Sequence, residues 1–314
     1  MQFPFELNLE KELDVLGFGT NAVDFLIRVP EYPAYDSKVE LTDYIRAAGG
    51  EVASTVAGLT RLGLRTAYAG RFGDDEAGDI GWQTLVDEGV EMTFAERIAG
   101  ARTQIAFILI DERTGERTVI WQRDKSLAYT PDEAPVEAAG KAKVLHFTPH
   151  DTEACLAMAR AAKAAGAIVS VDIDNVFDGV EELLSHVDIL ISSAEFPGKF
   201  LGISDVKTAI SELRARFGCG VTGVTLGAAG SLLLCGETYV ETPGFDVPGG
   251  CQDTTGAGDA FRTGLIFGLV TGESVEASAR MANAVAALKC RALGARTALP
   301  IRTELEDFLK KYRQ

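Results

Sequence analysis

Hydrophobic residues along the chain fall into two alternating patterns. Short apolar runs rich in β-branched residues predict buried strands at residues 14–18, 66–69, 144–147, 168–172, 189–192 and 221–226. Longer segments rich in Ala and Leu, with helical spacing, lie between them at residues 54–62, 152–165, 180–184 and 206–217. Strands that alternate with helices indicate a mostly parallel sheet with helices on both faces. We therefore predict an α/β fold, built as one continuous domain over residues 1–314.

Two regions interrupt this rhythm with strict alternation of apolar and polar residues. Residues 38–46 form one such stretch, and residues 103–110 and 117–122 form a pair joined by the turn-like sequence DERTGE. This alternation is typical of strands that have one face in water. We predict a small β-sheet that stands away from the main domain. It could be a lid or an oligomer contact, and the pattern leaves both open.

The net charge of the chain narrows the classes of partner that it is expected to bind. A formal net charge of −16 argues against nucleic acid and anionic membrane, although an acidic balance also simply keeps a protein soluble. Any anionic substrate must then be held by a local positive site. The amino terminus has no basic start followed by an apolar stretch, and no window approaches the roughly 20 apolar residues of a membrane span. We expect neither a signal peptide nor a membrane anchor.

The five cysteines are odd in number and scattered, and the chain has only three histidines. Neither a disulfide framework nor a zinc site is expected from this spacing. The reducing cytoplasm is the compartment that fits best.

The strongest chemical signal is the string DTTGAGDAF at residues 253–261. Small residues at Gly256, Ala257 and Gly258 allow a tight turn, and the apolar run after it has helical spacing. Free N–H groups at a helix start form an anion site, which suits a transferring phosphoryl group. Asp259 can accept the proton of an attacking hydroxyl there. A glycine-rich turn before an aspartate is by itself more often a capped helix start, so the argument depends on the whole string.

This string resembles the signature of the PfkB, or ribokinase-like, sugar kinases. The family's amino-terminal motif is matched by GGEVASTVAGLTRLG at residues 49–63, and AGRFGDDEAG at residues 69–78 is also typical. The sequence TLGAAG at residues 225–230 is similar to the family's nucleotide loop and follows a predicted strand. The motifs occur in the family's order and span nearly the whole chain.

The resemblance implies a Rossmann-like α/β domain with a β-sheet lid over about residues 25–48 and 98–125. It implies ATP-dependent phosphoryl transfer to a sugar hydroxyl, with Asp259 as the general base, Mg²⁺ as a cofactor and, in some members, a monovalent cation such as K⁺. Sugar and ATP would be the small-molecule partners, and a homodimer through the lid sheet is a further expectation. The implied residues are Gly256, Ala257 and Gly258 for the anion hole; Asp24, Gly49, Gly50 and Ser54 for the sugar; Thr225, Gly227, Gly230 and Asn283 for ATP; and Asp253, Thr255 and Glu195 for cations.

The chain departs from the family pattern at several points. Ser54 stands where many members have Asn, and Arg262 follows the catalytic string where many again have Asn. The family's Asn-x-x-Glu motif, which organises Mg²⁺ through water, reads SSAEF at residues 192–196. Glu195 is the carboxylate left in that region.

The identity of the substrate is the property that the sequence determines least. The sequence AALKC at residues 286–290 resembles ketohexokinases and other ketose kinases more than ribokinase proper, which favours a ketose such as fructose. The sugar pocket is expected to include lid residues and His150. A nucleoside or vitamin kinase stays open because Tyr44, Phe107 and Trp121 could stack on a base. A catalytically weak, ligand-binding pseudo-kinase stays open because the Mg²⁺ motif is altered.

Overall fold

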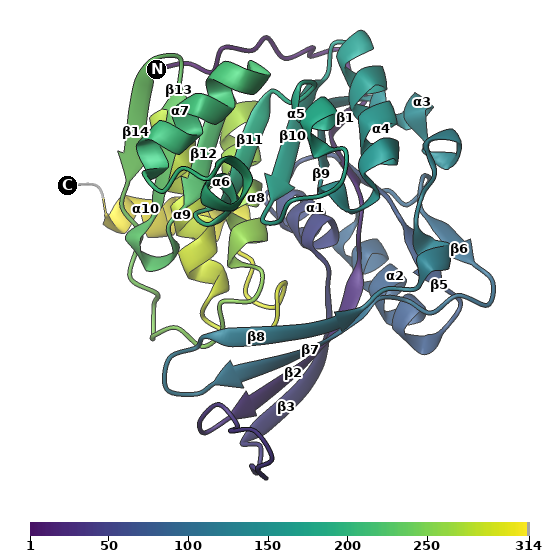
Figure 1. Cartoon of the computed structure of the whole chain (residues 1–314), viewed down its shortest axis with the longest axis vertical. Coiled ribbons are helices and arrows are strands. Elements are labelled where there is room, and N and C mark those ends of the chain that lie inside the picture. The colour runs from purple at the N-terminus through teal and green to yellow at the C-terminus, as the bar shows by residue number, and fades with distance from the viewer. Residues whose placement is uncertain (313–314) are drawn as a thin grey trace.

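The computed structural model describes residues 1–312, and its main body is an eight-stranded sheet in the order β14-β13-β12-β11-β10-β9-β1-β4 (Figure 1). The strands from β4 to β12 run parallel, and β13 and β14 extend one edge antiparallel. Their bounds are β1 Leu13–Phe18, β4 Thr66–Ala69, β9 Ala142–Phe147, β10 Ile168–Ile173, β11 Ile189–Ser193, β12 Val221–Thr225, β13 Ser231–Cys235 and β14 Thr238–Thr242.

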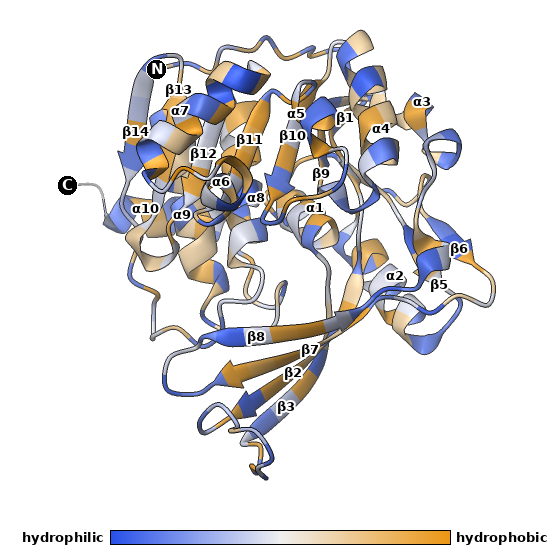
Figure 2. Cartoon of the chain, in the orientation of Figure 1, coloured by the Kyte–Doolittle hydropathy of each residue, from blue (hydrophilic) through white to orange (hydrophobic). Residues whose placement is uncertain are grey.

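Helices cover both faces of this sheet, and a separate hydrophobic cluster lies under each layer. Helices α3 to α7 pack on one face, and α1, α8, α9 and α10 pack on the other. Because both faces are covered, the central strands are buried along most of their length and carry many hydrophobic residues, with some polar positions among them (Figure 2). The bounds are α1 Glu51–Arg61, α2 Glu76–Glu88, α3 Val136–Ala139, α4 Thr152–Ala164, α5 Val180–Leu184, α6 Phe196–Leu201, α7 Val206–Phe217, α8 Ala257–Val270, α9 Val275–Lys289 and α10 Arg302–Lys311. The predicted α/β architecture is confirmed.

A four-stranded sheet, called the lid sheet below, projects from this body in the order β3-β2-β7-β8 (Figure 1). Strand β2 pairs with β7 in parallel, and the two outer pairs are antiparallel. Its strands are β2 Ala22–Val29, β3 Asp43–Gly49, β7 Ile105–Asp111 and β8 Arg117–Gln122. A short two-stranded sheet of β5 (Arg71–Gly73) and β6 (Glu96–Ile98) lies beside α2.

The two faces of the lid sheet differ in their surroundings. Leu26, Ala106 and Ile108 form an inward apolar cluster that packs against Leu293 of the main body. On the opposite face, Phe25 stacks on neighbouring aromatic rings and remains in contact with solvent. The apolar attachment of the sheet to the body is therefore made through its inward face, while Arg46 of β3 forms an ion pair with Glu76 of α2 at 2.7 Å.

The sequence interpretation of the lid sheet was wrong in two details. The strand expected over residues 38–46 begins only at Asp43. Strand β2 was not predicted as a strand, because a central strand covered on one face and partly covered on the other lacks clear alternation.

Among residues 1–312, no helix combines the length and the apolar character needed to cross a membrane.

Candidate active site

The glycine turn lies directly before α8, a helix that is buried along most of its length. Gly256 has φ of 76°, and a Cβ atom there would lie 2.7 Å from the Cβ of Ala295, so the turn requires glycine. Asp253 fastens the turn from both sides. Its Oδ1 accepts the N–H of Thr255 and its Oδ2 accepts the N–H of Gly294, each at 2.8 Å. The turn thus stands at a helix N-terminus, where the dipole favours a bound anion.

Asp259 lies in the first turn of α8 and is 9% exposed. Burial raises the pKa of its carboxyl well above the ordinary value, and the negative charges of Asp172 and Glu51 raise it further. The positive charges of Arg262 and Arg117 act against this shift. A carboxylate whose pKa is raised is a stronger proton acceptor than a free aspartate. The geometry therefore suits the predicted base.

Arg262 follows Asp259 by one helical turn and joins α8 to the sheet. Its Nη2 lies 2.5 Å from Oδ1 of Asp172, at the carboxyl end of β10, and donates to the carbonyl of Ile191 in β11 at 3.1 Å. Burial raises the pKa of Asp172 to about 7, and the guanidinium opposes that shift. The sequence flagged Arg262 only as a departure, and it missed Asp172, which looked like an ordinary strand residue.

Asp24 lies in β2 on the inward face of the lid sheet and is 5% exposed. Burial raises the pKa of its carboxyl to about 7, while the positive charge of Arg296 acts in the opposite direction. A Cβ atom on Gly49 would lie 2.0 Å from Oδ2 of Asp24, so this glycine leaves the room that the carboxyl occupies. Gly50 follows as the N-cap of α1. The structure thus brings these three predicted sugar-binding residues together.

Ser54, the fourth predicted sugar-binding residue, is held by Arg296. This buried guanidinium donates from Nε to the Ser54 hydroxyl at 3.3 Å and from Nη2 to the carbonyl of Gly49. Burial lowers its pKa to about 10, although the charges of Tyr68 and Asp24 work against that change. The sequence missed Arg296 because its partners lie more than 240 residues away along the chain. Its one signal was a charged residue within the small, apolar run LGARTALP.

His150 joins the lid sheet to the main body. Its Nε2 lies 3.0 Å from Oε2 of Glu51, and its ring packs edge-on against Trp121 of β8 and Phe177 at centroid distances of 6.1 and 5.3 Å. Burial works to lower the pKa of His150, but the Glu51 carboxylate overcomes it and raises that pKa. The sequence had not identified Glu51 as a site residue.

The three aromatic residues considered for base stacking do not share one face. Trp121 pairs with Ala106 and faces the main body, where it meets His150. Phe107 and Tyr44 stack with Phe25 on the outward face, at centroid distances of 4.9 and 6.4 Å. Successive residues of a strand point to opposite faces, so Phe107 and Tyr44 point away from the main body and Trp121 alone among the three stays a candidate for stacking on a substrate base.

The predicted nucleotide loop follows β12, as expected from the sequence. Thr225 ends that strand, and Gly227 opens a short, exposed 3-10 turn over Gly227–Ala229. Gly230 is buried and closes the turn next to the carbonyl of Thr242 in β14. An exposed loop at the end of a parallel strand is where α/β folds bind ligands.

Asn283 lies on α9 and is buried, and its side chain is engaged by the protein. The Nδ2 group donates to the hydroxyl of Ser231 and to the carbonyl of Thr242, both at 3.1 Å. These bonds tie α9 to β13 and β14 beside the loop. The contact with a nucleotide base stays a prediction.

The predicted cation ligands lie in different surroundings. Glu195 is exposed and precedes α6 at the carboxyl end of β11. Asp253 and Thr255 are buried, and the ammonium of Lys289 donates to the Asp253 carbonyl at 2.8 Å. The same nitrogen is 3.8 Å from Oδ2 of Asp253. Within residues 1–312, no group of three or more His, Cys, Asp or Glu side chains is arranged to hold a metal ion.

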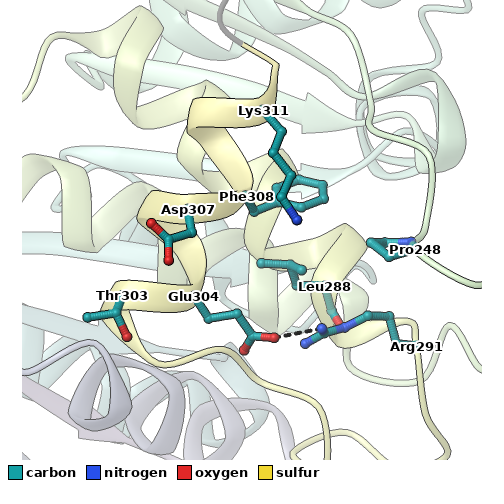
Figure 3. Close-up of a pocket in the computed structure, with 8 residues that line it drawn as sticks. All are labelled: Pro248, Leu288, Arg291, Thr303, Glu304, Asp307, Phe308 and Lys311. Carbon is teal, nitrogen blue, oxygen red and sulfur yellow. Dashed lines mark hydrogen bonds and ion pairs between the residues drawn. The ribbon is translucent and has the colours of Figure 1, made fainter.

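Two surface hollows are lined by residues other than the candidate base and Asp24. One, of about 390 Å³, lies beside α9 and α10, where Arg291 forms an ion pair with Glu304 at 2.6 Å (Figure 3). The other, of about 450 Å³, lies between the lid sheet and the loop before α8, where Arg28 donates to Gln252 at 3.2 Å. Neither is lined by Asp259 or Asp24.

A family model, curated relatives and solved structures all match this chain to sugar kinases. The model of the pfkB family carbohydrate kinases matches residues 13–302. Fructokinase-1 of Zea mays is 31% identical over 324 aligned positions, which cover 95% of this chain and 98% of that protein. An ATP-dependent ribose-1-phosphate kinase of Halopiger xanaduensis is 28% identical over 286 positions, covering 90% of this chain and 94% of that protein. The structure of Arabidopsis thaliana ribokinase with ribose and ATP has the same fold, with a TM-score of 0.81 at 23% identity over 95% of this chain and 99% of that one.

Proposed function

Because the chain belongs to the pfkB family of carbohydrate kinases, we propose that it transfers the γ-phosphoryl group of ATP to a hydroxyl of a ketose such as fructose, with Asp259 as general base. Sugar phosphorylation by ATP is the activity of this family, and the chain is a kinase of this kind. The observation that carries the assignment of the base is a buried carboxyl in the first turn of α8, directly after a glycine turn.

In the proposed reaction, Asp259 removes the proton of the sugar hydroxyl while the oxygen of that hydroxyl attacks the γ-phosphorus. The bond from the γ-phosphorus to the β–γ bridging oxygen breaks, and ADP leaves. The N–H groups of the glycine turn and the dipole of α8 stabilise negative charge on the phosphoryl oxygens. Asp24 accepts hydrogen bonds from other sugar hydroxyls and so orients the acceptor.

Mg²⁺ would accompany the phosphates of ATP and neutralise part of their charge. Glu195 is the residue we propose to hold its water shell, because it is exposed at the carboxyl end of β11. Glu195→Gln should raise the Mg²⁺ concentration needed for half-maximal activity. An unchanged Mg²⁺ titration would remove Glu195 from the site.

The base is tested by Asp259→Asn, which keeps the size of the side chain. Turnover should fall by roughly 10²–10⁴-fold, the usual contribution of a general base. Binding of ATP, measured by calorimetry, should persist. Turnover close to the native rate would refute the mechanism, and a panel of ketoses, pentoses, aldonates and nucleosides scored by ADP release would identify the acceptor.

A nucleoside acceptor is the second candidate, and Trp121 is the observation that favours it. This ring faces the main body from β8 and meets His150, so it could stack on a base. Trp121→Leu should then abolish thermal stabilisation by adenosine or cytidine. Stabilisation by fructose and not by nucleosides in the native protein would reject this candidate.

We also propose that the outward face of the lid sheet joins two copies of the chain. Phe25, Phe107 and Tyr44 stack there, and Ile120 beside them is 57% exposed. Exposed apolar patches of this kind mark interaction surfaces. Light scattering should report a dimer that Phe107→Lys converts to a monomer, and a native monomer would refute the proposal.

A further inference from the structure

Lys289 is the last residue of α9, and its ammonium group lies inside the protein beside the glycine turn. Lysine is almost never fully buried unless it is paired. Here Lys289 and its partner Asp253 are both 0% exposed, a property that no other ion pair within residues 1–312 shares. This burial indicates a specific role for the charge.

The acceptors around Lys289 are oxygen atoms that would also suit a metal cation. The ammonium donates to the carbonyl oxygen of Asp253 at 2.8 Å and lies 3.8 Å from the Oδ2 carboxylate oxygen of the same residue. Hard cations in proteins take such carbonyl and carboxylate ligands. Asp253 is one of the two residues for which the sequence had predicted a monovalent cation. Two positive charges within a few ångströms in a buried site repel each other strongly.

The same carboxylate controls the shape of the anion-binding turn. Asp253 accepts the N–H groups of Thr255 and Gly294 with its two oxygens, and the N–H of Gln252 donates to the carbonyl of Cys290 at 2.9 Å. The end of α9, the turn and the loop at Gly294 therefore form one connected unit. A positive charge at Lys289 balances the buried carboxylate that holds this unit together.

We propose that the ammonium of Lys289 takes the place of the monovalent cation, so that the kinase works without K⁺. This inference rests on the proposed kinase function, which it deepens. Lys289 acts as a positioning residue: it touches neither sugar nor phosphate, and it fixes the turn before α8. K⁺ itself does not fit the native site, because its ligands already serve the ammonium.

The test compares the native protein with Lys289→Ala and Lys289→Met in chloride salts of K⁺, Na⁺ and tetramethylammonium at one ionic strength. The native kcat/KM should be the same in all three salts. Without K⁺, Lys289→Ala should lose roughly 10²-fold in kcat/KM, and K⁺ should restore about tenfold, because alanine opens space for an ion beside the oxygen ligands. Lys289→Met is the matched control: it fills the space without a charge, so K⁺ should not rescue it.

A second readout does not depend on turnover. K⁺ should raise the melting temperature of Lys289→Ala above its value in tetramethylammonium, because an ion that binds only the folded state stabilises it. The native melting temperature should not respond to K⁺. If the native protein is activated or stabilised by K⁺, or if Lys289→Ala keeps native activity without K⁺, the proposal is wrong. Should the alanine variant fail to fold, the native response decides alone. If the native protein phosphorylates no sugar, while K⁺ stabilises Lys289→Ala and leaves the native melting temperature unchanged, only the kinase function is refuted.

Discussion

The proposed site has two ends, one for phosphoryl transfer at Asp259 and one for the sugar at Asp24, and they bury carboxyl groups in different electrostatic settings. At the phosphoryl-transfer end, Asp259 stands near the charges of Asp172 and Glu51, and Arg262 offsets them only in part. At the sugar end, the largest charge effect on Asp24 is the attraction of Arg296. The first end is crowded with negative charge, while the second is closer to balance.

The two ends also differ in how they are assembled. The phosphoryl-transfer end is formed by one helix start and the carboxyl ends of neighbouring strands within the main body. The sugar end lies where the lid sheet meets that body and combines Asp24, Gly49 and the distant Arg296. The turn and the base of the first end therefore lie close together along the chain, although Arg262 joins them to distant strands, whereas the second end is assembled from distant segments throughout.

The largest effect is expected at the crowded end. Arg262→Met removes the partner of Asp172 and leaves that carboxyl buried beside Asp259. Loss of one partner of a buried ion pair typically costs about 3–5 kcal/mol. Urea unfolding should show this loss in the free energy of unfolding. Adding Asp172→Asn should recover part of it, and a single variant as stable as the native protein would show that the pair contributes little.

At the sugar end, the buried carboxyl of Asp24 should make the stability of the protein depend on pH. The pKa of Asp24 is raised by burial to about 7, so the folded state holds this proton more tightly than the unfolded state. The resulting stability is present below the ordinary aspartate pKa and is lost as the pH rises through about 7, by up to about 4 kcal/mol. Asp24→Asn, which mimics the protonated form, should therefore melt at a higher temperature than the native protein at pH 8 and close to it at pH 4.

Asp24→Asn should also raise the KM for sugar, because an amide oxygen accepts hydrogen bonds from sugar hydroxyls less strongly than a carboxylate does. The native KM for sugar should also rise as the pH falls below about 7 and Asp24 gains its proton. A flat pH profile for the sugar KM, together with equal melting temperatures at pH 8, would contradict the assigned pKa.

Arg296→Lys sharpens the contrast between the ends. Lysine keeps the charge but cannot bond both the Ser54 hydroxyl and the Gly49 carbonyl with a planar fork. A lost bond to a charged donor corresponds to about 1.5–3 kcal/mol, so the sugar kcat/KM should fall by roughly 10–100-fold. The KM for ATP should stay the same. Arg302→Lys, in an exposed pair with Glu306, is the matched control and should change neither constant.

The smallest expected effect is at Asn283. Its amide bonds Ser231 and the Thr242 carbonyl, so Asn283→Ala should cost about 1 kcal/mol of stability per lost bond. If Asn283 only ties α9 to the sheet, the KM for ATP should stay unchanged once the fold is intact. A clear rise in that KM would instead assign it to the nucleotide site.

Most of the main fold could be predicted from the sequence, because buried parallel strands and amphipathic helices are local patterns. Strand β2 escaped prediction, since its register becomes clear only from pairing with β3 and β7. Among the candidate site residues, the glycine turn and Asp259 share one string of nine residues, and its resemblance to the sugar kinase signature was enough to propose their roles. The face on which each aromatic residue of the lid sheet lies could not be predicted from the sequence. Phe107 pairs with Ile120, so Trp121, the next residue of β8, lies on the opposite face.

The sequence alone determined the class of fold and pointed to a candidate anion-binding turn and a candidate base, because each depends on residues that are neighbours along the chain. Only the tertiary structure placed Arg296 beneath Ser54, paired Arg262 with Asp172 and buried Lys289 against Asp253. Each of these contacts joins residues that are far apart in the sequence. A buried charge leaves no periodic pattern, so its partner becomes known only when the chain is folded around it.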